Sequence, residues 1–80
     1  MCRIKARVAD GLIPAEKIVY IETASGNTAE VFVSASQVHG GGLEVTEVVR
    51  EQNQVLVELP NESTSGDWRL WVRPASVMVG

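Results

Sequence analysis

Apolar and polar residues alternate in short runs along this chain, and glycine, asparagine, serine and proline separate the runs. A period of two is typical of antiparallel strands with one buried face, whereas the spacing of an amphipathic helix is nearly absent. The alternation predicts about six strands, over residues 3–9, 17–23, 30–34, 43–50, 54–59 and 68–73. We therefore expect an all-β protein.

Turn-forming residues indicate how neighbouring runs connect. The sequence Ser25-Gly26-Asn27 predicts a hairpin between the second and third strands, because these residues tolerate positive φ. Residues 51–53 predict a second hairpin, between the fourth and fifth strands. Val48 and Val49 break the alternation of the fourth strand, and a β-bulge near Glu47 would restore it by adding one residue.

A faint internal repeat links two parts of the chain. Ser25-Gly26 precedes residues 30–33 and then Val38, much as Ser65-Gly66 precedes residues 69–72 and then Val77. In both copies the stretch before the valine predicts one turn of 3₁₀ helix and a brief strand. Two interpretations stay open, a duplicated hairpin unit or two hairpins that converged on the same turn residues.

Chain length narrows the architecture. Eighty residues without a compositional break predict one domain over residues 1–80. A two-sheet sandwich is too large for such a chain, and closing a bent sheet removes its unpaired edges. We expect an SH3-like barrel of about six short antiparallel strands, with a 3₁₀ turn before the C-terminal strand. Its core is thin, so self-association into a homo-oligomer would add stability.

Composition excludes several classes of site. The net charge is −3, and no targeting signal or membrane-length apolar stretch is present, so we expect a soluble protein without a membrane partner. Cys2 is the only cysteine, which rules out an intrachain disulfide and favours a reducing, cytoplasmic location. The only histidine, His39, precedes three glycines, where we expect an exposed loop. We predict no catalytic residues, no metal site and no cofactor.

The last predicted strand carries the most distinctive side chains. If Trp68 points into the core together with every second residue after it, then Trp71 points outward between Arg69 and Arg73. Phe32 holds the equivalent position in the first copy of the repeat. An outward aromatic ring between two arginines is a natural anchor for a protein partner or a nucleic-acid base.

The first predicted strand presents further cations. Arg3, Lys5 and Arg7 alternate with apolar residues, so they point outward together. An SH3-like barrel could bring this strand close to the last one, where the cations would either meet glutamates or attract an anionic partner. The candidate binding residues are Trp71, Arg69, Arg73, Arg3, Lys5, Arg7 and Phe32.

Three functions fit these observations. The first is a non-catalytic protein-interaction or assembly module that binds itself and a protein or peptide partner. The second is an enzyme whose active site forms between subunits; in size and C-terminal strand pattern the chain resembles the type II dihydrofolate reductases, although residues 68–71 replace their Val-Gln-Ile-Tyr motif. The third is a single-stranded nucleic-acid binder that uses the same Trp and Arg face.

Overall fold

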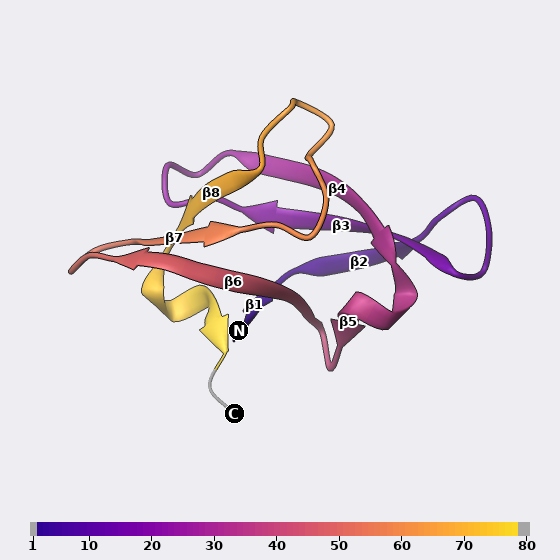
Figure 1. The fold of residues 1–80 in the computed structure, drawn as a ribbon, viewed down its shortest axis with the longest axis horizontal. Helices are drawn as coiled ribbons and strands as arrows, with labels where there is room; N and C mark the ends of the chain where they lie inside the picture. The colour runs from indigo at the N-terminus through magenta and orange to yellow at the C-terminus, as the bar shows by residue number, and fades with distance from the viewer. Residues whose placement is uncertain (1, 79–80) are drawn as a thin grey trace.

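The computed structural model describes residues 2–78 and is all-β, with two antiparallel sheets and two 3₁₀ turns. Figure 1 shows how the strands are arranged. The strands are β1 (Cys2–Lys5), β2 (Arg7–Asp10), β3 (Glu16–Glu22), β4 (Thr28–Ser34), β5 (Val38–His39), β6 (Gly42–Arg50), β7 (Val55–Glu58), β8 (Arg69–Val72) and β9 (Val77–Met78). The 3₁₀ turns are η1 (Ala35–Gln37) and η2 (Pro74–Ser76).

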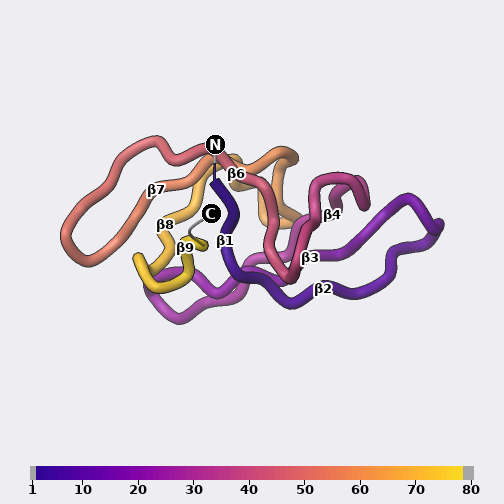
Figure 2. The backbone as a smooth tube through the Cα atoms, turned by 90° about the horizontal axis from the view of Figure 1, so that it is seen from below, coloured from indigo at the N-terminus to yellow at the C-terminus, as the bar shows by residue number. Residues whose placement is uncertain are grey.

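The two sheets differ in size. The larger one has the order β8-β7-β6-β1-β9, with β5 also paired to β6, and the smaller one has the order β2-β3-β4. The prediction of a closed barrel is therefore wrong. The predicted first strand is split at Ala6, so β1 belongs to one sheet and β2 to the other. The path of this bent segment between the sheets is clear in the view of Figure 2.

A few hydrogen bonds join the sheets where a barrel would have closed. The main-chain N–H of Ala24, after β3, donates to the carbonyl of Trp71 on β8 at 2.8 Å. The N–H of Thr64, in the loop after β7, donates to the carbonyl of Glu30 on β4, also at 2.8 Å. These isolated contacts do not make a continuous ladder, so the structure stays two sheets.

One cluster of buried aliphatic side chains lies between the sheets. The fully buried members include Ile4 on β1, Val19 on β3 and Leu43 on β6. Alternation explains which residues are buried, because every second residue of β7, β8 and the second half of β4 is buried and those between are half-buried or exposed. The complete set is Ile4, Val19, Ile21, Val31, Val33, Leu43, Val45, Val55, Val57, Leu59, Leu70 and Val72.

The predictions that rested on local sequence are confirmed. Gly26 has φ of +90° in the hairpin between β3 and β4, and the N–H of Thr23 donates to the carbonyl of Asn27 at 2.8 Å. The register of β6 against β7 shifts between Glu47 and Val49, which is the predicted bulge. Both predicted 3₁₀ turns are present, and each leads into a two-residue strand.

Candidate functional site

Two arginines, one on β8 and one directly after it, are paired with glutamates. Arg69 lies directly opposite Glu58 on β7, and its Nε is 3.1 Å from Glu58 Oε2. Arg73 forms an ion pair with Glu22 at the end of β3. We expected these cations either to meet glutamates or to attract an anionic partner. For Arg69 and Arg73, the structure contains the pairing with glutamates.

The cations of the N-terminal segment lie elsewhere. Strands β6 and β7 separate β1 from β8, so Arg3 and Lys5 are not on a strand next to Arg69. Arg3 Nη1 donates to the carbonyl of His39 at 3.2 Å. Arg7 belongs to the smaller sheet, where its guanidinium lies 4.7 Å from the ring centroid of Tyr20. The structure thus does not gather all of the predicted basic residues on one surface, although Lys5 and Arg7 line a hollow together with Glu22, the ion-pair partner of Arg73.

The two aromatic residues of the predicted surface are also apart. Trp71 is half-buried and lies in a cross-strand row with Leu56 and Val49, on the face of the larger sheet opposite its buried residues. Phe32 is 38% exposed, and it lies opposite Ile18 in the smaller sheet. They belong to different sheets and do not form a common site.

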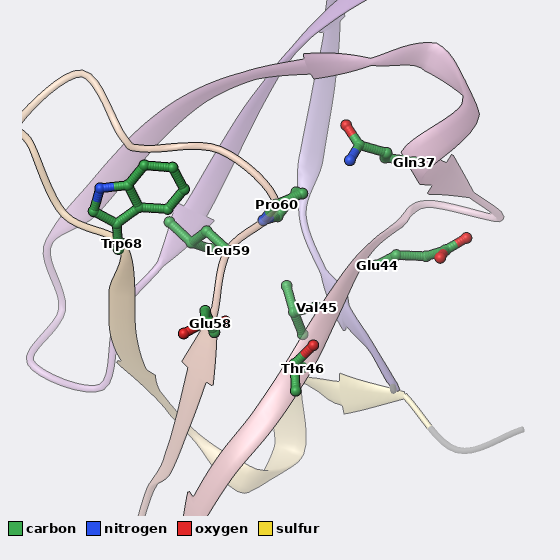
Figure 3. A pocket seen from close by; sticks show the side chains of 8 residues that line it. All are labelled: Gln37, Glu44, Val45, Thr46, Glu58, Leu59, Pro60 and Trp68. Carbon is green, nitrogen blue, oxygen red and sulfur yellow. The ribbon is translucent and has the colours of Figure 1, made fainter.

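Trp68 is the aromatic residue whose predicted position is wrong. Alternation from Leu70 predicts a buried side chain, but the residue is 54% exposed. Trp68 lies one residue before β8 begins, where its carbonyl still accepts a hydrogen bond from the N–H of Leu59 at 2.8 Å but little protein covers the ring. Figure 3 shows the indole above Leu59, at the rim of a recess. At the end of a strand, a position across from a buried residue therefore does not by itself mean burial.

This recess is a groove of about 390 Å³, which we call the Trp68 groove. It lies where β6 changes partner, because Leu43 pairs with Val38 of β5 and Thr46 pairs with Glu58 of β7. In the described part of the chain, the residues between them, Glu44 and Val45, have register partners on β1 alone. The lining residues are Gln37, Glu44, Val45, Thr46, Glu58, Leu59, Pro60 and Trp68 (Figure 3).

Polar groups of the Trp68 groove are fixed by their neighbours. Gln37 Oε1 accepts a hydrogen bond from the N–H of Ser34 at 3.0 Å, so its NH₂ group is turned the other way, toward Pro60 (Figure 3). Glu44 Oε1 lies 2.8 Å from Nε2 of His39, and the Glu44 side chain extends away from the indole (Figure 3). The groove therefore offers an amide donor and a hydroxyl, that of Thr46, beside an aromatic wall.

The charges of the Trp68 groove are acidic. Glu58 lies directly across from Thr46, and Glu44 lies two residues before Thr46 on the same strand. Next to them, in the bulge, the side-chain hydrogen bond from Arg50 lowers the pKa of Glu47, and Arg50 Nη2 is 2.8 Å from Glu47 Oε1. Within residues 2–78, no three His, Cys, Asp or Glu side chains are grouped as metal ligands would be.

Sequence reasoning missed the Trp68 groove because its lining comes from η1, β6 and the end of β7. The available signal was the Trp68 position itself, a large aromatic residue directly after the polar loop 60–67. No helix in the described part of the chain is long and apolar enough to cross a membrane. Comparisons of the chain with protein-family models, with curated proteins and with solved structures gave no match.

Proposed function

We propose that this chain is a non-catalytic protein-interaction module that binds a segment of a partner protein in the Trp68 groove. The observation that carries the proposal is the 54% exposed indole of Trp68 at the rim of a recess. Tryptophan is enriched among the residues that contribute most to binding at protein interfaces, because a large ring buries much apolar area with few rotatable bonds. Pro60 and Leu59 extend the same apolar wall.

The lining of the Trp68 groove describes the partner segment that fits it. An aliphatic side chain would pack against the indole, and the NH₂ group of Gln37 and the hydroxyl of Thr46 would bond its backbone. The carboxylate of Glu58 bonds Arg69 through one oxygen, so the other oxygen can accept a hydrogen bond from a cation. A lysine or arginine side chain would provide both the aliphatic group and the cation, because its methylene chain would pack on Trp68 and its charge would lie beside Glu58.

The same charges argue against a nucleic acid. Proteins that bind single strands line their grooves with cations and stack bases on aromatic rings. Here the groove beside the most exposed aromatic ring is lined by Glu58 and Glu44, and by no lysine or arginine among the described residues. Arg69 and Arg73 are paired with glutamates, so their charges are largely compensated. An enzyme with its site between subunits is the remaining alternative.

Fluorescence titration with synthetic peptides tests the proposal. The probes are three pools of extended peptides that share one apolar residue and differ in a neighbouring lysine, glutamate or serine. We expect the lysine pool to bind most tightly and a single-stranded oligonucleotide to give a flat response at low salt. Trp68→Ala should weaken peptide binding at least about thirtyfold, as loss of a hot-spot residue does.

Phe32→Ala is the matched control, since it removes another exposed aromatic ring from the other sheet. This variant should bind the lysine pool like the unmodified chain. Equal losses in both variants, no binding by any pool, or tighter binding of the oligonucleotide would each reject the Trp68 groove as a protein-binding site.

We also propose an SH3-like relationship for the fold and a cytoplasmic location for the protein. An SH3-like relationship is supported by the bent N-terminal segment that serves both sheets and by the 3₁₀ turn η2 before the last strand. A cytoplasmic location is supported by the free thiol of Cys2.

A further inference from the structure

The outer edge of β2 has unpaired backbone groups. Among the strands of residues 2–78, β2 pairs only with β3, and the N–H of Gly11 donates to the carbonyl of Glu16 at 3.0 Å. Backbone direction alternates along an antiparallel strand, so Arg7 and Ala9 also face β3, while Val8 and Asp10 face away from it. Within residues 2–78, no backbone hydrogen bond is made on that side by Val8 or Asp10.

The charged side chains of β2 interact with residues of the neighbouring strand β3. Sheet edges are commonly protected by charges that project past them. Here Lys17 Nζ lies 2.7 Å from Asp10 Oδ1, and the guanidinium of Arg7 lies over the ring of Tyr20. Lys17 and Tyr20 both belong to β3, so each of the two charges has its partner within its own sheet. Ala9, on the same face of β2 as Arg7, is small and exposed.

Exposed apolar side chains follow the edge directly. Leu12 is 92% exposed and Ile13 is 59% exposed, at the tip of the loop that joins β2 to β3. This loop projects from the body of the molecule at the right of Figure 1. Two large aliphatic side chains at such a tip cost solvation free energy unless a second surface covers them.

A hollow of about 500 Å³ lies at the opposite end of β2. It is lined by Lys5, Ala6, Arg7, Tyr20, Glu22, Thr28 and Ser76. The tip and the hollow are therefore at the two ends of one short edge strand. If two copies of that strand pair antiparallel, the tip of each meets the hollow of the other.

We propose that two copies of this chain form a symmetric dimer by pairing their β2 edges antiparallel, with Ala9 opposite Ala9 at the two-fold axis. In this register Val8 faces Asp10 of the partner subunit, and the reverse, so every free backbone group of both edges is bonded. An axis at Val8 would instead place Asp10 against Ala6, whose N–H already donates to the carbonyl of Gly41 at 3.2 Å. Of these two registers, the one with its axis at Ala9 pairs unbonded backbone groups only with one another.

A second copy is a better occupant than an unrelated strand. β2 has four residues, so its edge offers few hydrogen bonds and a foreign strand would gain little from them alone. A copy of this chain adds its own Leu12 and Ile13, which the register brings alongside Ala6 and Lys5 of the first chain. Two-fold symmetry makes this contact twice, and the three-stranded sheets join into one.

Substitution of Ala9 by charged residues of either sign tests the contact at the two-fold axis. Light scattering over a dilution series should show a dimer that dissociates into monomers. Ala9→Lys and Ala9→Glu each place like charges opposite one another and should raise the dimer dissociation constant at least about fivefold. Mixing the two variants should restore the dimer, because lysine then faces glutamate. The control Val49→Lys changes an exposed apolar residue of the other sheet and should leave dimerisation unchanged.

A cross-link provides the second measurement. In a Cys2→Ser background, Ala9→Cys should form an intermolecular disulfide on mild oxidation, since directly opposed residues of a non-hydrogen-bonded pair lie close together. Ser25→Cys, in the exposed hairpin turn, should stay mostly reduced under the same conditions. A monomer at every concentration, charge variants that dimerise like the unmodified chain, or no cross-link at residue 9 would overturn the proposal.

Discussion

The side-chain amide of Asn61 donates a hydrogen bond to the main-chain carbonyl of Phe32, with Nδ2 and O 2.7 Å apart. Together with the bond from Thr64 to Glu30, it places the loop after β7 along the outer edge of β4. That edge of the smaller sheet is therefore occupied by the chain itself. The opposite edge, β2, has no such cover within residues 2–78.

Asn61→Ala should loosen this loop. The variant loses one hydrogen bond at an exposed position, so the free energy of unfolding should fall by about 0.5–1 kcal/mol. Hydrogen exchange should also speed up in the loop and along β4. The control is Asn53→Ala, in the exposed turn between β6 and β7, which should change stability less. Identical exchange in Asn61→Ala and the unmodified chain would show that the loop is held by other contacts.

Ile4→Ala should be among the most damaging single changes. Ile4 is fully buried and pairs with Leu43 on one side and Val77 on the other. Truncation leaves a cavity and should cost about 2–5 kcal/mol, measured by urea denaturation. Val49→Ala, which shortens an exposed side chain, should cost less than about 1 kcal/mol. Similar losses for the two variants would mean that Ile4 is not part of a packed core.

Gly26 should be replaceable only at a conformational cost. Its φ is +90°, and a Cβ at this position would meet no atom within 4 Å. The penalty for Gly26→Ala is therefore one of backbone conformation, about 1–2 kcal/mol in thermal unfolding. Gly26→Asn should cost less, because asparagine tolerates positive φ better. If the two variants were equally stable, the turn would have rearranged.

The two tryptophans should respond differently to truncation. Trp71 is half-buried against its cross-strand neighbour Leu56, so Trp71→Ala should lower the free energy of unfolding by about 1–3 kcal/mol. Trp68→Ala removes a ring that is 54% exposed and should cost less than about 1 kcal/mol. Urea denaturation measures both. The opposite order would place Trp68, rather than Trp71, among the residues that stabilise the fold.

The pKa of Asp10 should depend on Lys17. The hydrogen bond from Lys17, followed by its charge, lowers the pKa of Asp10 below the ordinary 3.8. Because the pKa is lowered in the folded state, the resulting stability is present above pH about 4 and is lost as pH falls through the lowered value. Lys17→Met should raise the pKa of Asp10 in an NMR titration. Lys5→Met is the matched control and should leave it unchanged.

Several features of this protein follow from short stretches of sequence. The hairpin at Gly26, the bulge after Glu47 and both 3₁₀ turns were predictable, because each depends on residues a few positions apart. Alternation also identified which residues of β8 face the core, since a paired strand has a fixed period of two.

Only the tertiary structure decided which strands became neighbours and where each strand ended. Strand pairing joins residues far apart in sequence, and no local pattern states that β6 and β7 separate β1 from β8. Trp68 is exposed although its hydrogen-bond partner Leu59 is buried, and the ion pair of Arg73 depends on Glu22 at the end of β3. Local sequence determined the elements through backbone geometry and turn conformation, whereas the Trp68 groove and the uncovered β2 edge arose from how those elements pack.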